Sequence, residues 1–226
     1  MRALLILCLF LVAACGRPLT ENEIAFARTF KGDTVDYDRV RLVDGAPTRA
    51  VTFRREARPR VTCRALIVPP PTEEIVTSKP AAVALYNRIL FDKDWYLEDY
   101  LRDYPDRIGL IAAMLFAHEM THVWQWQNRK VTGYSPLRAA LEHGGTRDPY
   151  LFDLDTKTRF LDFGFEQQGT IVEEYVCCRA LAPASPRTAR LHKLISEVMP
   201  LSPLPQSRAY DVALPWDGVD LPGLCV

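Results

Sequence analysis

The sequence predicts a single α+β domain in which a small N-terminal sheet precedes a central helix that packs on a second, glutamate-bearing helix. Polar and apolar residues alternate over residues 35–43, which is the period of a strand. Residues 108–129 form a long, largely uncharged stretch without proline, and residues 165–181 form another. With 226 residues, the chain is long enough to build one substantial core.

The overall charge excludes one class of partner. Lys plus Arg and Asp plus Glu both number 28, so the formal net charge is zero. No global basic character would recruit nucleic acid, and no acidic tract suggests a disordered tail. We therefore expect no nucleic-acid partner.

The N-terminus has the pattern of a secretory leader. A positive start is followed by an apolar stretch that is too short to span a membrane, and residues 12–15 read V-A-A-C, like a bacterial lipobox. We expect residues 1–14 to be a signal peptide of the lipoprotein type and Cys15 to carry a lipid anchor. The protein would then lie in the bacterial cell envelope, at its periplasmic or outer-membrane face. The alternative is an ordinary signal peptide with an incidental cysteine.

The remaining cysteines point to an oxidising compartment. If Cys15 is lipidated, an even number is left for pairing: Cys63, Cys177, Cys178 and Cys225. At least one disulfide is expected, and three pairings are open. A bond between Cys177 and Cys178 is disfavoured because adjacent residues of a helix point to different faces. A cysteine zinc site is the alternative, but no C-x-x-C motif supports it.

The N-terminal elements follow from local patterns. Residues 19–30 read as a helix, with Thr20 as its cap and Glu23 completing a capping box. Residues 35–43, 50–55 and 61–68 are strand candidates, and three consecutive prolines end this region.

The rest of the chain is mostly helical in pattern. Residues 80–91 fit either a short helix or a strand and turn, and residues 92–106 read as surface structure. The helix over 108–129 is followed by a connector with a short helix near 135–142, and then by helices over 165–181 and 187–198. We expect residues 15–181 to form the domain, and residues 182–226 to add a helix and a proline-rich tail that packs on it without regular structure.

The most informative motif lies in the 108–129 helix. Residues 118–122 read H-E-M-T-H, and two of only four histidines in the chain fall here. On a helix, residues four apart share a face, so His118 and His122 can bind one metal ion while Glu119 accepts a proton from the attacking water. The alternative is a pair of histidines that only pack or hydrogen-bond.

A catalytic zinc ion needs a third protein ligand. His143, in a glycine-rich loop, and His192, at the start of an amphipathic helix, lie in no recognisable frame. Residues 166–170 read E-Q-Q-G-T, which resembles the E-x-x-A-D segment of gluzincins in its glutamate and its small residue. This resemblance implies Glu166 as the third ligand. Glu173, seven residues on, shares its face and is the alternative, while Thr170 replaces the acidic residue that orients a histidine.

Several segments together resemble a group of small bacterial proteins labelled Vgr-related. They are the N-terminal stretch 19–41, the H-E-M-T-H-V-W-Q segment at 118–125, the E-Q-Q segment at 166–168 and an acidic residue followed by Tyr at 174–175. The resemblance covers most of residues 19–178. It implies a zincin-like fold of the gluzincin type, a Zn²⁺ site and a loose link to secretion apparatus.

We therefore expect a zinc-dependent hydrolase, most simply a metallopeptidase acting on a peptide or protein. His118, His122 and Glu166 would bind Zn²⁺, and Glu119 would act as the general base. The donor for the developing oxyanion is open among Tyr134, His143, Arg147, Tyr150 and Tyr175. One alternative is a non-catalytic envelope lipoprotein that uses zinc to join two helices, with a structural or secretion-associated role. A second is an effector of a secretion system, against which the lipobox speaks.

Overall fold

The computed structural model describes residues 16–54, 59–144 and 148–226. The predicted signal peptide, Cys15 and Arg147 lie outside these residues. None of the helices in the described ranges combines the length and apolar character needed to cross a bilayer.

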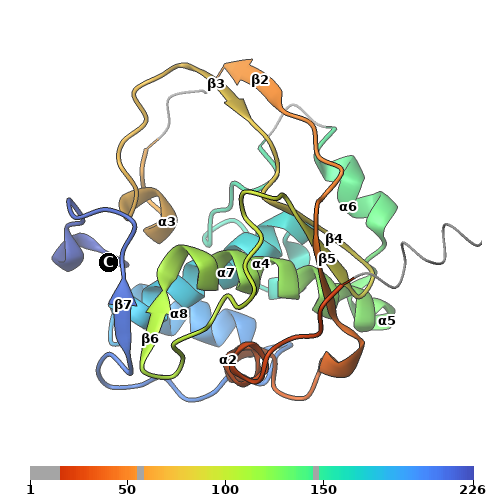
Figure 1. The fold of residues 1–226 in the computed structure, drawn as a ribbon. Coiled ribbons are helices and arrows are strands. Elements are labelled where there is room, and N and C mark those ends of the chain that lie inside the picture. The colour runs from red at the N-terminus through yellow and green to blue at the C-terminus, as the bar shows by residue number, and fades with distance from the viewer. Residues whose placement is uncertain (1–15, 55–58, 145–147) are drawn as a thin grey trace, which may run out of the picture.

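The described chain mixes helices with short strands (Figure 1). The α-helices are α2 (Glu21–Lys31), α3 (Cys63–Leu66), α4 (Leu110–Gln127), α5 (Arg129–Thr132), α6 (Pro136–Glu142), α7 (Phe165–Leu181) and α8 (Pro186–Ile195). The strands are β1 (Arg41–Asp44), β2 (Val51–Arg54), β3 (Ile75–Ser78), β4 (Ala82–Leu85), β5 (Arg88–Phe91), β6 (Arg107–Gly109) and β7 (Asp211–Ala213). Short 3-10 turns are η1 (Tyr37–Arg39), η2 (Phe160–Asp162) and η3 (Leu221–Gly223).

Helices α4 and α7 pack on one another at the centre of the molecule, with α8 beside α7 (Figure 1). A three-stranded sheet in the order β1-β5-β4 lies against α4; β1 is parallel to β5, and β4 is antiparallel to it. The β2–β3 pair forms a separate antiparallel ribbon that projects from the body, and β6 pairs with β7 in parallel. This arrangement leaves β4 as an edge strand next to α4.

The predicted start of α2 is confirmed. Thr20 accepts a hydrogen bond from the Glu23 backbone, and the Glu23 side chain reaches back to the Thr20 backbone, which completes the capping box. The Glu23 carboxylate is fully buried, and it is held by two hydrogen bonds from Arg17 (2.7 and 2.8 Å) and one from the Tyr100 backbone (3.0 Å). A buried carboxylate is tolerable only with such partners, so this cluster fixes the N-terminal segment against the core.

Several predicted elements were wrong. Residues 61–68 form α3 instead of a strand, because Thr62 caps the turn through the Ala65 amide and the buried Cys63 is bonded to α7. Residues 35–43 divide into η1 and the start of β1. Residues 92–106 are not all surface, since Tyr100 and Leu101 are buried beside the sheet and α4. The tail after residue 199 contains β7 and η3.

The undecided residues 80–91 form the β4–β5 hairpin, which turns through Tyr86 in the left-handed region (φ 59°).

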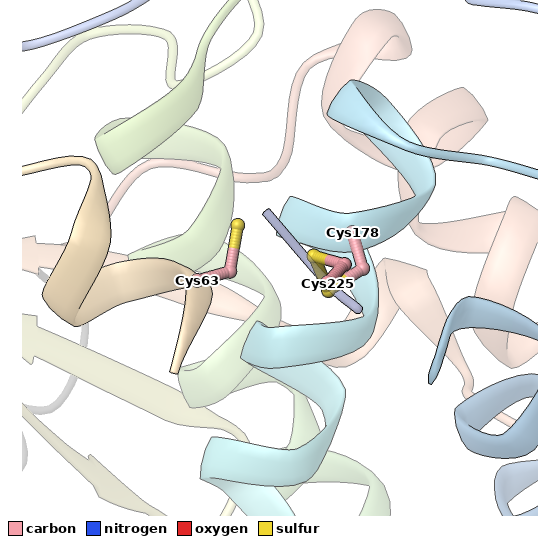
Figure 2. Close-up of side chains that lie close together, drawn as sticks. All are labelled: Cys63, Cys178 and Cys225. Carbon is pink, nitrogen blue, oxygen red and sulfur yellow. A yellow bond between two sulfur atoms is a disulfide. The ribbon is translucent and has the colours of Figure 1, made fainter. Parts of the chain in front are cut away.

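Two disulfides tie distant segments to α7, which confirms the expectation of at least one. Cys63 of α3 bonds to Cys177, and Cys178 bonds to Cys225 near the C-terminus. Figure 2 shows Cys63 reaching from α3 towards α7, and Cys178 beside Cys225. Cys63, Cys178 and Cys225 have sulfur atoms within 4.8 Å of one another. Because all three are in disulfides, they offer no thiolate to a metal ion.

Lys31, the last residue of α2, is fully buried against α4. Its Nζ donates to Thr121 Oγ1 (2.9 Å) and lies over the rings of Phe30 and Trp124. Burial lowers the pKa of Lys31 well below the ordinary value of 10.5. Between the folded and the unfolded pKa, the unfolded chain binds one more proton, so in that interval the free energy of unfolding rises with pH.

We therefore predict that Lys31→Met raises the melting temperature at neutral pH, by roughly 2–4 °C for each kcal/mol recovered. The gain over the unsubstituted protein should shrink as the pH is raised towards 10.5, the ordinary pKa of lysine, because the unfolded natural chain then loses its proton as well and folding no longer has to release one. Thermal unfolding followed by circular dichroism at several pH values measures this, with the exposed Lys193→Met as control. A gain that does not change with pH would contradict the argument.

Candidate metal centre

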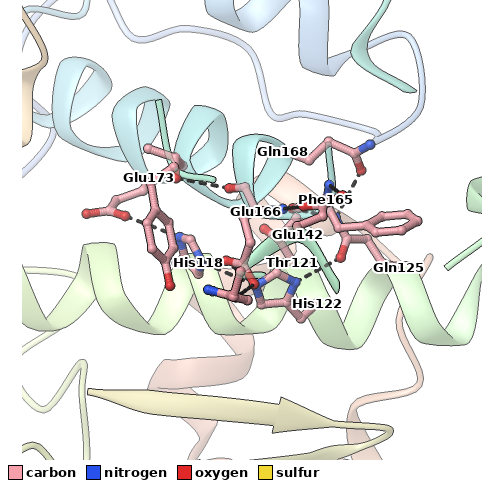
Figure 3. Close-up of polar contacts among 12 residues, drawn as sticks. His118, Thr121, His122, Gln125, Glu142, Phe165, Glu166, Gln168 and Glu173 are labelled. Carbon is pink, nitrogen blue, oxygen red and sulfur yellow. Dashed lines mark hydrogen bonds and ion pairs between the residues drawn. The ribbon is translucent and has the colours of Figure 1, made fainter. Parts of the chain in front are cut away.

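The two motif histidines lie on the face of α4 that packs against α7. His118 and His122 are almost fully buried, and their Nε2 atoms are 3.2 Å apart. Glu166, in the first turn of α7, places Oε2 3.2 Å from His118 Nε2 and 3.3 Å from His122 Nε2. The three predicted ligands thus point at one place, where their donor atoms form a nearly equilateral triangle (Figure 3).

The triangle has the size that a zinc ion requires. Zinc binds imidazole nitrogen and carboxylate oxygen at about 2.0–2.1 Å, and tetrahedral angles then separate neighbouring donor atoms by about 3.3 Å. The observed separations of 3.2–3.3 Å match this value. Two imidazoles and one carboxylate are also a ligand set that suits zinc better than magnesium or calcium.

The close approach of the two helices depends on Gly169. A Cβ at this position would lie 2.8 Å from His118 Cε1 and Nε2, closer than atoms pack. Any larger residue would push α7 away from α4 or displace the His118 ring. The small residue in the E-Q-Q-G segment therefore has a direct steric role.

Hydrogen bonds fix both imidazole rings. His122 Nδ1 donates to Gln125 Oε1 (2.9 Å), while Gln125 Nε2 donates to Phe165 O and Gln168 Oε1 (both 3.0 Å). Because the amide nitrogen is used by these acceptors, its oxygen must face His122. His118 Nδ1 lies 3.3 Å from Glu173 Oε2 and donates to it. Each ring therefore has a partner for a proton on Nδ1, which makes Nε2 the atom that a metal ion would bind.

The Glu166 carboxylate is held from other directions. Its Oε1 lies 3.0 Å from His143 Nε2. Glu142, at the end of α6, accepts hydrogen bonds from the backbone amides of Phe165 and Glu166 at the start of α7 (2.9 and 3.0 Å). A carboxylate at a helix N-terminus satisfies otherwise unpaired amides, and here it also fixes the first turn that carries Glu166.

The electrostatics favour a cation. Burial by itself lowers the pKa of His118, but its hydrogen bonds to Glu166 and Glu173 outweigh this and raise the pKa to about 10. Burial would raise the pKa of Glu166, but the histidines around it hold the pKa well below its usual range. Both shifts report the same field, in which carboxylates surround the imidazoles and stabilise positive charge.

Glu119 lies in the same buried cluster. Burial raises its pKa, and the neighbouring histidines oppose this. Its Oε2 is buried, and no hydrogen-bond partner for it occurs among the described residues. Such an atom costs free energy unless something else occupies the site, so it fits a position that a water molecule or substrate group would fill.

Of the other predicted site residues, Glu173 contacts a motif histidine, whereas Thr170 and His192 do not. Glu173 contacts the far nitrogen of His118 rather than joining the ligand triangle. Thr170 has no part in orienting a histidine, because its hydroxyl donates to the Glu166 carbonyl within α7 (3.0 Å). His192 lies away from the site, with its Nε2 next to Ser202 O (3.2 Å).

Among the oxyanion candidates, Tyr150 and Tyr134 flank the histidines. The Tyr150 ring lies 5.9 Å from the His118 ring, and the Tyr134 ring lies 6.2 Å from the His122 ring. Tyr175 is buried and its ring lies 6.0 Å from that of His192, on the α8 side. The contacts made by Gln125 and Glu142 were missed at the sequence level. Only Gln125 had a local signal, since it follows His122 by three residues on the same helix.

The comparisons with known proteins agree on one relative. No model of a protein family matches the chain. It is 30% identical over 167 residues to the type VI secretion system spike protein VgrG2b of Pseudomonas aeruginosa, in an alignment that covers 72% of this chain and 13% of that protein. The solved effector domain of VgrG2b from the same organism superposes with a TM-score of 0.52 and 26% identity, covering 83% of this chain and 86% of that domain.

The chain therefore spans only 13% of the length of that spike protein, and the matching structure is its effector domain. Sequence and structure together show that this chain is related to the VgrG2b effector domain.

Proposed function

We propose that this chain is a zinc-dependent hydrolase whose substrates are peptides or proteins. The observation that carries the proposal is the triangle of His118, His122 and Glu166, whose donor atoms lie 3.2–3.3 Å apart inside a buried, negatively biased cluster. The packing alternative does not require two Nε2 atoms and one carboxylate oxygen to meet at the spacing of zinc ligands.

The bound zinc ion would act as a Lewis acid, which polarises the scissile carbonyl and lowers the pKa of the attacking water. Glu119 would accept the proton of that water and pass it to the leaving amine. Its buried Oε2, which has no hydrogen-bond partner among the described residues, suits both steps. Tyr150 and Tyr134, which flank the histidine rings, are the candidates for donating to the oxyanion.

An open sheet edge supports a peptide substrate. Strand β4 is the last strand of the β1-β5-β4 sheet and contacts α4. An extended peptide can add to such an edge through backbone hydrogen bonds, independently of its side chains. The exposed Val83 and Leu85 leave apolar surface along this strand for the side chains of a substrate.

The relation to VgrG2b supports a secretion-associated role. The matching region of that protein is described as an effector domain, and the protein itself as a type VI secretion spike. This relation supports an effector role, which the lipobox disfavours, more strongly than a purely structural role. A non-catalytic protein that uses zinc to join α4 to α7 is the second candidate, favoured by the steric role of Gly169.

Attachment to the bacterial envelope through Cys15 is part of the proposal. It rests on the V-A-A-C pattern at residues 12–15. Growth with a fatty-acid probe should label the natural protein and leave Cys15→Ser unlabelled. Absence of label from both proteins would remove the lipid anchor from the proposal.

We predict that Glu119→Gln keeps stoichiometric zinc and loses hydrolytic activity by about 10²–10⁴-fold, the usual contribution of a general base. Zinc content is measured by elemental analysis, and cleavage by mass spectrometry on a peptide library. The exposed Glu98→Gln is a matched control for the loss of one carboxylate and should retain activity.

If the Glu119→Gln protein is as active as the natural one, the catalytic role of Glu119 is wrong. If the natural protein binds zinc but cleaves nothing, the structural alternative is preferred. If it binds no zinc, the site assignment itself fails.

We also predict that Gly169→Ala weakens zinc binding at least about tenfold, because the added Cβ would lie 2.8 Å from His118 Cε1 and Nε2. Competition with a chromophoric chelator measures the affinity. Gly109→Ala is the control, since its added Cβ would come no closer than 3.9 Å to its nearest neighbour, the Cβ of Ala112. Equal affinities in the two variants would show that close helix packing at Gly169 is not needed for the site.

A further inference from the structure

Helix α3 is joined to α7 by three separate contacts next to the candidate metal centre. Cys63 forms a disulfide with Cys177, and its backbone amide donates to Glu174 Oε2 (2.8 Å). Arg64, the next residue, donates from Nη1 to Glu173 Oε1 (2.7 Å). All three contacts fall within about one and a half turns of α7. They give α3 a defined position, although it lies in the long segment between β2 and β3.

Arg64 continues a line of contacts into the centre. One oxygen of Glu173 accepts from Arg64, and the other, Oε2, accepts from His118 Nδ1 (3.3 Å). The Glu173 side chain is only 3% exposed, while that of Arg64 is 57% exposed. A guanidinium at the surface thus contacts a buried carboxylate, and the same carboxylate contacts His118.

We propose that Arg64 is a positioning residue for the metal site, and that the Cys63–Cys177 disulfide holds it there. Arg64 fixes the Glu173 carboxylate so that its second oxygen meets His118 Nδ1 and the His118 Nε2 atom faces His122 and Glu166. This inference rests on the proposed zinc site, and it adds a residue and a covalent bond on which the site depends.

Two physical arguments support it. A buried carboxylate with one partner removed is poorly compensated and tends to reorient towards water or another donor. Partners that orient a metal-binding histidine typically contribute about 10–100-fold to metal affinity. Arg64 contacts Glu173 and not His118 itself, so we expect its effect on metal affinity to lie at the lower end of that range.

The chain supplies a matched control in Arg187. Its Nε donates to Glu174 Oε1 (2.8 Å), so it forms the same kind of ion pair with the adjacent glutamate of α7. The two glutamates are buried to a similar degree, since the side chain of Glu174 is 2% exposed and that of Glu173 is 3% exposed. Within the described part of the chain, no hydrogen bond or ion pair joins Glu174 to either motif histidine. The Cys63 amide binds Oε2 of Glu174 and Arg187 binds Oε1, so Arg187→Met tests for a general effect of losing an arginine on α7 while the acceptor for the Cys63 amide remains.

The experiment compares the zinc dissociation constants of the full chain and of Arg64→Met, Arg64→Lys and Arg187→Met, by competition with a chromophoric chelator at neutral pH. We expect Arg64→Met to weaken zinc binding roughly tenfold, Arg64→Lys to recover most of the loss, and Arg187→Met to match the natural protein. Melting temperatures of the zinc-free proteins show whether the two arginines differ in their general effect on stability.

An unchanged affinity in Arg64→Met, or an equal loss in Arg187→Met, overturns the positioning role while leaving the zinc site intact. Absence of zinc from the natural protein is a different result, because it refutes the proposed function.

A second pair of variants tests the disulfide. Cys63→Ser with Cys177→Ser frees α3, whereas Cys178→Ser with Cys225→Ser removes the neighbouring disulfide, which leads to the C-terminus. We expect only the first pair to reduce zinc affinity to the level of Arg64→Met. Equal affinities in the two folded pairs would show that the disulfide does not hold Arg64; if the first pair does not fold, the Arg64 variants still decide the central claim.

Discussion

The close approach of α4 and α7 at Gly169 is the constraint on which the rest of the centre depends. With no side chain at this position, the His118 ring lies directly against the backbone of α7. Glu166 lies one turn earlier on the same helix, and the contact therefore brings its carboxylate to the histidines without a long reach. A wider separation would still permit two helices to pack, but the three donor atoms would no longer meet.

Contacts beyond the ligands then decide which atoms face the centre. Gln125 and Glu173 accept hydrogen bonds from the Nδ1 atoms of the two rings. His143 contacts Oε1 of Glu166, the carboxylate oxygen outside the ligand triangle. Each contact restricts the orientation of a candidate metal ligand. Preorganisation of this kind would reduce the free-energy cost of ordering the site on binding.

The parts that the sequence predicted well are those set by local spacing. The histidines four apart, the capping box at Thr20 and the length of α7 all follow from residues within one or two turns of each other. Glu166 was chosen through a short segment that also contains Gly169. The parts that could not be predicted involve distant segments: α3 owes its position to a disulfide across 114 residues, and Glu142 caps α7 from a separate helix. Local pattern places Thr170 where gluzincins have the orienting acid, whereas the acid that contacts His118 is Glu173, on the next turn.

Helix α7 carries both the candidate metal site and the structural bonds, because its periodicity places their residues on neighbouring faces. Glu173 and Cys177 are four residues apart and share a face, which meets α3; Glu174 and Cys178 share the adjacent face. Each face thus carries one acid for an arginine and one cysteine for a disulfide. Because only the first acid also reaches His118, the two faces bear similar bonds but differ in what depends on them. One face of α7 thus serves both the fold and the candidate metal site, while the face beside it serves the fold, and the residues concerned lie within about two turns of one another.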